Sequence, residues 1–213
     1  MIKLTNVSKK YGNNVIYKDF NLAFEEGKVY AILGNSGCGK TTLLKIIAGL
    51  TDYVGEVDGA INPSFVFAED RLIFHKTVKE NLLFVNPRKD VSSMLERVGL
   101  KEWENAYPKE LSTGMSRRVS VLRAFCFDSK LMLLDEPFRN LDLSLKYKLM
   151  DFFLELKNAD NKTAIMVTHD PDEAVYIADK VFIIDKGQVV FEEEIFNKEL
   201  SLERIKKQLI NRQ

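Results

Sequence analysis

A glycine-rich segment in the first quarter of the chain carries the most specific chemical pattern in the sequence. It reads Gly34-Asn35-Ser36-Gly37-Cys38-Gly39-Lys40-Thr41, which fits the phosphate-binding pattern G-x-x-x-x-G-K-[ST]. Glycines let backbone N–H groups curl around phosphate oxygens, and a helix that starts here adds partial positive charge. Lys40 then supplies a cation for the β- and γ-phosphates of a nucleotide, and Thr41 a hydroxyl for Mg²⁺. The alternative, a glycine-rich turn before an ordinary helix, rarely produces this pattern in this position.

Two adjacent carboxylates form a second candidate site. Asp135 and Glu136 follow the apolar run Leu131-Met132-Leu133-Leu134, so they are expected at the carboxyl edge of a parallel sheet, where such sheets bind ligands. Asp135 suits a Mg²⁺ ligand, and Glu136 suits a general base that activates a water molecule. Taken alone, two acids after a strand are more often a loop start or a helix cap. The phosphate-binding loop in the same chain favours the functional interpretation.

The elements that must position these residues follow from the hydrophobic pattern. Alternating apolar residues over 2–34 predict antiparallel strands that lead into a buried strand at 29–33, and a helical period follows the glycine-rich segment. Short strands are expected at 55–57 and 65–67, with a short hairpin around Gly55–Phe65, and the pattern between about 76 and 128 is helical throughout. The remainder alternates strands and helices: 131–135, 143–158, 163–168, 171–178 and 181–185, then a hairpin and a C-terminal helix. This order predicts an α/β fold with a largely parallel sheet and an inserted all-α subdomain at about 76–128, within one domain spanning 1–213.

Composition limits the classes of function. Lys+Arg and Asp+Glu both number 31, for a formal net charge of +0, and no segment is strongly basic, so the electrostatic footprint of a nucleic-acid binder is missing. No apolar run approaches the roughly 20 residues of a membrane-spanning helix, and residues 1–7 do not resemble a secretory signal. Cys38 and Cys126 lie in unlike contexts and are expected to be free thiols in a reducing compartment. The sequence thus predicts a cytoplasmic protein that reaches a membrane only through a partner.

A further motif, Leu111-Ser112-Thr113-Gly114-Met115, gives the chain a family resemblance. With it, the sequence resembles the ATP-binding-cassette (ABC) ATPases, whose signature reads LSGGQ or LSGGM, over nearly its whole length and with the motifs in the family's order. The matching elements are Tyr11, residues 34–42, the segment Phe65–Asn81, the pair Asp135 and Glu136, Leu141-Asp142, and His169 after the apolar run 164–168.

The resemblance implies a P-loop NTPase fold with a RecA-like core and an N-terminal antiparallel β region, and an ATPase that uses ATP and Mg²⁺. It assigns catalysis to Lys40, Glu136 and His169, and the metal to Thr41 and Asp135. An isolated strand-end histidine is usually satisfied by neighbouring backbone, but the position of His169 among the motifs favours a role at the γ-phosphate. The nucleotide-binding residues that it implies are Tyr11, Gly34, Asn35, Ser36, Gly37, Cys38, Gly39, Lys40, Thr41, Thr42, Ser112 and Gly114.

The resemblance also implies partners. Family members dimerise head to tail, so Ser112 and Gly114 are expected to grip ATP held by a second ATP-binding subunit, identical or different. An integral membrane permease subunit is the other expected partner, which places the chain on the inner face of the cell membrane. Residues 69–82 are similar to the ATP subunits of nitrate, sulfonate and taurine importers, so import is favoured, with an extracytoplasmic solute-binding protein as a further candidate partner. An ATP-gated regulatory or exporter-associated module is the alternative.

The apolar residues of the segment Phe65–Asn81 have two interpretations that the sequence does not separate. They are expected either to build a groove for a short helix of the membrane subunit or to belong to the core. The residues concerned are Phe65, Phe67, Leu72, Ile73 and Phe74.

Three departures from the family pattern carry further expectations. Ala68 stands where the family has a glutamine that touches Mg²⁺ and the attacking water, and Glu69 is one position away, where a strand would turn it to the opposite face. We therefore expect ATP to bind but turnover, or its coupling to transport, to be weaker than is usual. Thr113 replaces a signature glycine where the backbone must approach phosphate closely, so we expect either strain or an added contact from its hydroxyl. Phe138-Arg139-Asn140 differs from the usual small lead-in to Leu141-Asp142, so an altered dimer contact is expected there.

Overall fold

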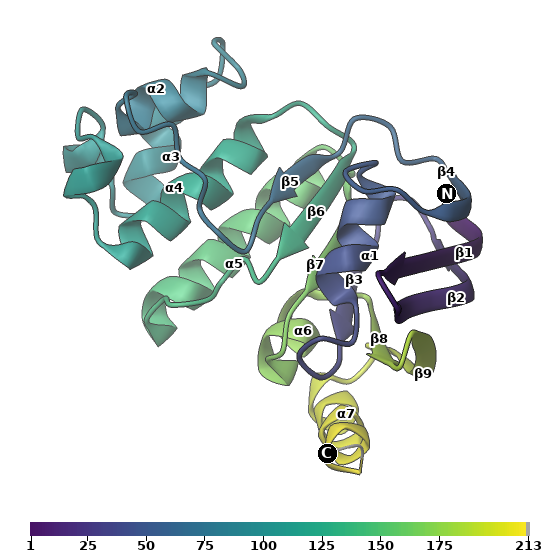
Figure 1. Cartoon of the computed structure of the whole chain (residues 1–213). Helices are drawn as coiled ribbons and strands as arrows, with labels where there is room; N and C mark the ends of the chain where they lie inside the picture. The colour runs from purple at the N-terminus through teal and green to yellow at the C-terminus, as the bar shows by residue number, and fades with distance from the viewer. Residues whose placement is uncertain (212–213) are drawn as a thin grey trace.

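The N-terminal residues form a small antiparallel sheet. The computed structural model describes residues 1–211, and its first sheet has the order β2-β1-β4 (Figure 1). Its strands are β1 (Ile2–Tyr11), β2 (Asn14–Phe24) and β4 (Val54–Asp58). Buried and exposed residues alternate along the start of β1, as the period of two in the sequence predicts for a sheet with one covered face.

A six-stranded sheet forms the centre of the molecule, with the order β5-β6-β7-β3-β8-β9. Its strands are β3 (Val29–Leu33), β5 (Ser64–Val66), β6 (Leu131–Asp135), β7 (Thr163–Val167), β8 (Lys180–Asp185) and β9 (Gln188–Glu194). All neighbouring pairs are parallel except β8 and β9, which form an antiparallel hairpin. Every residue of β3, β6 and β7 is buried, which explains their continuous apolar sequence, since both faces of this sheet are covered.

Two apolar clusters cover the two faces of the central sheet. One contains residues of β1, β2 and α1 (Lys40–Ile47) together with Tyr30 and Ile32, and the other contains Ala31 and Leu33 with residues of the remaining helices. The alternation of side chains along β3 thus divides its residues between the two clusters. The remaining helices of this region are α5 (Leu143–Ala159), α6 (Pro171–Ile177) and α7 (Lys198–Ile210).

The segment between β5 and β6 is a helical excursion at the end of the molecule far from β1 and β2 (Figure 1). It contains α2 (Val78–Leu83), α3 (Val91–Arg97), 3₁₀ turns at Lys101–Trp103 and Pro108–Glu110, and α4 (Thr113–Cys126). A capping box between Thr77 and Glu80 starts α2, and α4 contacts α2, β5 and α5. The helices are short and separated by loops, so the pattern expected over 76–128 is helical in type but not continuous.

The hairpin expected around Gly55–Phe65 is wrong. β4 pairs with β1 in the small sheet, whereas β5 pairs with β6 in the central sheet. A Cβ atom at Gly55 would lie 2.5 Å from the backbone oxygen of Asn6, so the glycine permits a close approach to β1 that a local sequence pattern does not reveal.

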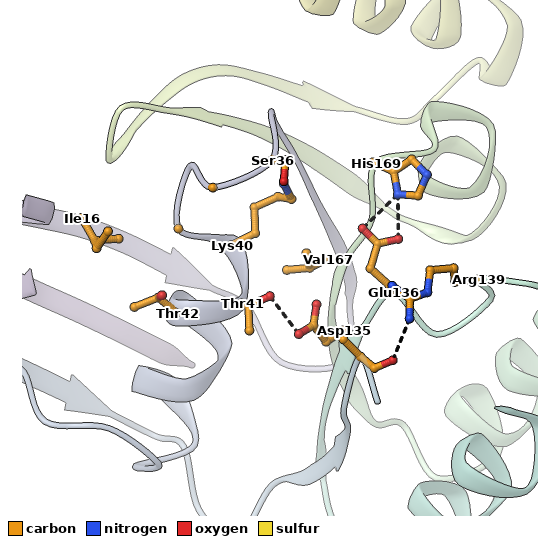
Figure 2. A pocket seen from close by; sticks show the side chains of 13 residues that line it. Ile16, Ser36, Lys40, Thr41, Thr42, Asp135, Glu136, Arg139, Val167 and His169 are labelled. Carbon is orange, nitrogen blue, oxygen red and sulfur yellow. Dashed lines mark hydrogen bonds and ion pairs between the residues drawn. The ribbon is translucent and has the colours of Figure 1, made fainter. Parts of the chain in front are cut away.

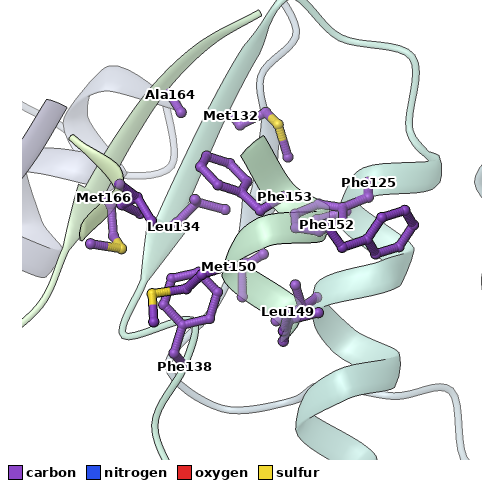
Figure 3. Packing of buried hydrophobic residues seen from close by; sticks show 14 of the residues in the cluster. Phe125, Met132, Leu134, Phe138, Leu149, Met150, Phe152, Phe153, Ala164 and Met166 are labelled. Carbon is purple, nitrogen blue, oxygen red and sulfur yellow. The ribbon is translucent and has the colours of Figure 1, made fainter. Parts of the chain in front are cut away.

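The cluster on the α5 side of the sheet packs phenylalanine rings among aliphatic and methionine side chains (Figure 3). Phe153 is fully buried, with its ring centroid 5.8 Å from that of Phe125. Phe125 also meets Phe152 edge to face at 6.2 Å.

Within residues 1–211, no helix has both the length and the apolar character required to cross a bilayer.

Replacing a central aromatic residue of this cluster tests its contribution to stability. Phe153→Ala is expected to lower the free energy of unfolding by about 3–5 kcal/mol, because it removes a fully buried ring and leaves a cavity. Urea unfolding followed by circular dichroism measures the loss. The matched control is Phe196→Ala, which removes a ring that is 90% exposed and is expected to cost less than about 0.5 kcal/mol. Equal losses in the two variants would contradict this description of the core.

Candidate functional site

The glycine-rich segment connects the buried strand β3 to the helix α1. Gly39 is the N-cap of α1 with φ 105°, and Gly34 has φ 151°. A Cβ atom at Gly34 would lie 2.2 Å from the Ile184 carbonyl oxygen, and one at Gly39 would lie 2.6 Å from Ile16 Cγ2. Both positions therefore require glycine, and the loop that they permit turns backbone N–H groups toward the start of α1.

The Lys40 side chain folds back over this loop. Its Nζ donates hydrogen bonds to the carbonyl oxygens of Gly34 at 2.8 Å and Asn35 at 2.9 Å. The side chain is 9% exposed, so its ammonium group lies inside the ring of the loop. A cation in this position attracts an anion bound by the loop.

Thr41 and Asp135 bring two oxygen donors together from distant parts of the sequence. Thr41 Oγ1 donates a hydrogen bond to Asp135 Oδ2 at 2.9 Å. Burial raises the pKa of Asp135, the charge of Glu136 acts in the same direction, and the hydrogen bond from Thr41 opposes them. A hydroxyl and a buried carboxylate are hard oxygen ligands and fit Mg²⁺, which in nucleotide sites takes few protein ligands and completes its shell with phosphates and water. No cluster of three or more His, Cys, Asp or Glu side chains among residues 1–211 suggests a different metal.

Glu136 and His169 face each other across the ends of β6 and β7. His169 Nδ1 lies 2.8 Å from Glu136 Oε2 and 3.0 Å from Oε1 (Figure 2). Because a carboxylate only accepts hydrogen bonds, Nδ1 carries the proton in this contact. Glu136 has φ 50°, a left-handed conformation that is costly for a side chain of this size and typical of functional sites.

A network behind His169 fixes the chain on which it stands. Thr168 Oγ1 donates to Glu173 Oε2 at 2.7 Å, and Asp170 caps α6 by accepting from backbone N–H groups. Lys146 of α5 pairs with both acids, at 2.6 Å from Glu173 and 3.1 Å from Asp170. The histidine is thus an exposed side chain on a firmly anchored backbone.

Arg117 is a part of the site that sequence reasoning missed. This residue of α4 is 3% exposed, and its guanidinium donates to the carbonyl oxygens of Pro137 at 3.0 Å, Asp135 at 2.8 Å and Phe67 at 2.6 Å. It also donates to the Glu136 carbonyl oxygen and pairs with the Asp70 carboxylate. Burial lowers its pKa from the ordinary value, and the Asp70 charge opposes that effect. Only its charge and its place beside the signature motif signal this role in the sequence, and neither reveals which carbonyl groups it contacts.

These elements surround one cavity of about 370 Å³ (Figure 2). Its walls contain nine of the residues expected at the site: Ser36, Gly37, Gly39, Lys40, Thr41, Thr42, Asp135, Glu136 and His169. Four further residues that were not assigned to the site also line it: Ile16, Ala68, Arg139 and Val167. The expected residues Tyr11, Gly34, Asn35, Cys38, Ser112 and Gly114 are not part of its lining.

Tyr11 lies close to this cavity without lining it. It ends β1, is 48% exposed, and has Lys9 Nζ 4.5 Å from its ring centroid. Hydrogen bonds to Thr51 and Thr42 lower its pKa from the ordinary value. The exposed ring next to Thr42 is therefore available to a flat group that extends out of the cavity.

The signature motif lies at the start of α4, outside the cavity. Ser112 is the N-cap and accepts a hydrogen bond from the Met115 N–H at 3.3 Å, and a Cβ atom at Gly114 would lie 3.4 Å from the Asn140 carbonyl oxygen. Thr113 is the first residue of α4 and is not among the residues with positive φ, and the strain expected there on close approach to a phosphate stays a prediction. Ser112 and Thr113 are exposed, so this helix N-terminus is open to a second molecule.

The loop after β5 contains Ala68 and Glu69, and the two side chains lie in different surroundings. Its carboxylate pairs with Arg71 at 3.1 Å and is 76% exposed, whereas Ala68 lines the cavity. Glu69 thus points away from the site and does not replace the glutamine of the family pattern.

The apolar residues of 65–74 divide between core and surface. Leu72 is buried, whereas Phe74 is 80% exposed. Phe65 and Phe67 stack at 4.3 Å and line a shallow groove with Val85, Arg123 and Phe127. Leu72 therefore belongs to the core and Phe65 and Phe67 to a groove, while the contact of that groove with a membrane subunit stays a prediction.

Comparisons with known proteins identify the family of this chain. The family described as ABC transporter matches residues 17–139. The aliphatic sulfonates import ATP-binding protein SsuB 2 of Pseudomonas syringae pv. tomato is 41% identical over 83% of this chain and 78% of its own length. SsuB of Bacillus licheniformis is 42% identical over 79% of this chain and 72% of its own.

A solved structure shows the same fold. The ATP-binding cassette MJ0796, in a dimeric post-hydrolysis state bound to ADP and Pi, superposes with a TM-score of 0.82 at 30% identity and covers 92% of this chain and 100% of its own. The chain belongs to the ABC transporter family and has the fold of its ATP-binding cassettes.

Proposed function

We propose that this chain is the ATP-binding and ATP-hydrolysing subunit of an ABC importer. The observation that carries the proposal is the convergence of the phosphate-binding loop, Asp135, Glu136 and His169 on one cavity. The family membership and the import subunits among its relatives support it.

The loop binds the phosphates of ATP. Its N–H groups and the N-terminus of α1 surround the β-phosphate, and Lys40 exchanges its bonds to the loop carbonyls for phosphate oxygens. Tyr11 stacks on the adenine ring where the nucleotide leaves the cavity. Thr41 and Asp135 would hold Mg²⁺, directly or through water, and a bound ion would supply positive charge against the phosphates.

Glu136 and His169 perform the proton chemistry. Glu136 removes a proton from a water molecule whose oxygen attacks the γ-phosphorus while the bond to the ADP oxygen breaks. His169 is 2.8 Å from the carboxylate, so it orients this base and reaches the γ-phosphate side of the cavity. Its exposed ring becomes enclosed only when another surface covers the site.

A second ATP-binding subunit supplies that surface. Ser112 and Gly114 lie at an exposed helix N-terminus outside their own chain's cavity, and a helix N-terminus binds phosphate. In a head-to-tail pair, each signature motif therefore contacts the γ-phosphate of the ATP held by the other subunit. Hydrolysis removes that shared ligand and loosens the pair.

The exposed apolar side of the helical excursion receives the membrane permease subunit. Phe67 and Phe127 line a groove in this region, and a short amphipathic helix fits such a groove. Phe74 is an exposed ring of the same region. This partner implies placement on the inner face of the cell membrane, and import implies a solute-binding protein on the opposite side as a further candidate partner. The import ATP-binding proteins among the relatives of this chain favour import over an exporter-associated or regulatory module.

Removing the general base separates binding from hydrolysis. Glu136→Gln is expected to lower the ATPase rate by about 100-fold or more while ATP binding persists, because the amide accepts no proton from water. A phosphate-release assay with and without Mg²⁺ measures the rate, and size-exclusion chromatography with ATP tests whether the variant is trapped as a dimer. The control is Glu199→Gln, an exposed acid on α7, with an expected rate equal to that of the wild type. An active Glu136→Gln variant would remove Glu136 from the mechanism.

Asp135 is expected to stabilise the nucleotide complex at the expense of the free protein. Its pKa is raised by burial, so the protein loses stability as pH rises from the ordinary carboxyl value through the raised one. Asp135→Asn should therefore raise the melting temperature of the nucleotide-free protein, more at about pH 8 than at about pH 4. It should also weaken the Mg²⁺-dependent part of ATP binding. Differential scanning fluorimetry across this range checks both effects, and a variant that melts lower than the wild type at about pH 8 would contradict the assignment.

A further inference from the structure

We infer that Arg139 is a phosphate-contacting residue of this site, which binds the terminal phosphate of ATP from the position that Ala68 leaves open. The inference rests on the proposed function and adds a residue to it. Arg139 lines the cavity together with Ala68, Glu136 and His169, and Figure 2 shows it on the Glu136 side, away from Lys40.

The contact with Ala68 places the guanidinium. Arg139 Nη2 donates a hydrogen bond to the Ala68 carbonyl oxygen at 3.4 Å, and the Ala68 side chain ends at its methyl group. A longer side chain at position 68 would project into the cavity that the arginine now lines. The small residue and the large one are therefore complementary parts of the same wall.

The charge of Arg139 is not compensated within the described chain. No ion pair of Arg139 occurs among residues 1–211, and the side chain is exposed. The N–H groups of the neighbouring Arg117 are already hydrogen-bonded to carbonyl oxygens and to Asp70. The charge of Arg139 contributes to lowering the Arg117 pKa. A guanidinium with five donors, one long hydrogen bond and a like-charged neighbour gains from an anion in the adjacent cavity.

The backbone ties Arg139 to the general base. Its N–H donates to the Glu136 carbonyl oxygen at 3.3 Å, and the intervening Phe138 is fully buried. The two side chains therefore leave one tight turn, which fixes the cation close to the base. In phosphoryl transfer, negative charge spreads over the equatorial oxygens of the γ-phosphate, and a guanidinium beside them stabilises it.

The test combines turnover with nucleotide discrimination on the full-length chain. Arg139→Ala is expected to lower kcat by about 10- to 100-fold, and Arg139→Lys by less, because the lysine retains charge but not the planar fork. In a Glu136→Gln background, Arg139→Ala is expected to weaken ATP binding about 10-fold and to leave ADP binding unchanged, since only ATP carries the γ-phosphate. Arg88→Ala, an exposed arginine outside the cavity, is the matched control.

A double variant tests the place of Arg139 beside Ala68. Ala68→Gln is expected to recover part of the lost kcat in the Arg139→Ala protein and to lower kcat in the wild type, where the longer side chain meets the guanidinium, a non-additive result that neighbouring groups produce. If the effects of Ala68→Gln and Arg139→Ala on kcat are strictly additive, the two residues do not share one place in the cavity wall. Equal losses of ATP and ADP binding in Arg139→Ala would show that Arg139 has only a structural role. Wild-type protein that binds no ATP would instead contradict the proposed function, whereas wild-type binding with an unaffected Arg139→Ala variant would contradict only this inference.

Discussion

The side-by-side arrangement of β6, β7 and β3 is the constraint on which the site depends. Val167 is level with Ile32 on one side and with Asp135 on the other, so the three strands end at the same height. The phosphate-binding loop, the acidic pair and His169 each follow one of these ends. Because hydrogen bonding between buried parallel strands fixes their register, the positions of these groups are fixed by the sheet and not by the loops themselves.

The buried guanidinium of Arg117 connects this edge of the sheet to the helical excursion. Arg117 stands near the start of α4 and contacts backbone carbonyl groups of both the β5 loop and the end of β6. A buried cation is tolerated only when its donors are satisfied, and here every donor has an acceptor. The helix that carries the signature motif is consequently bonded to the segment that carries Glu136, so displacement of one strains the other.

The site concentrates unfavourable features that a bound nucleotide relieves. Asp135 is buried beside a second carboxylate, Glu136 has a left-handed backbone, and Arg139 lacks an anionic partner among the described residues. Lys40 meanwhile bonds to its own loop. The buried carboxylate and the left-handed backbone of Glu136 cost stability in the free protein, as is common where function and stability compete. A bound phosphate would supply the anion that Arg139 lacks.

How much of the fold and site follows from the sequence differs between kinds of residue. The phosphate-binding loop, the strand that precedes it and the acidic pair could be predicted from the sequence. Each depends on the residue types within a short stretch of chain, such as glycines, an apolar run or the start of a helix. The family pattern added His169 and the signature motif, and it exposed Ala68 as a departure. Local pattern failed at Gly55–Phe65, where it suggested a hairpin between strands of two different sheets.

Tertiary structure alone decided the partners of the charged side chains. Arg117 and Arg139 have no sequence pattern that distinguishes a solvated arginine from one that clamps buried carbonyl groups or lines a cavity. Their positions depend on contacts between segments far apart in the chain, such as Phe67 with α4 and Ala68 with the turn after Glu136. The sequence by itself thus identified the groups that are candidates for the chemistry, since reactivity and backbone freedom are local properties. The fold decided what surrounds those groups, because burial and charge pairing arise only when distant segments pack together.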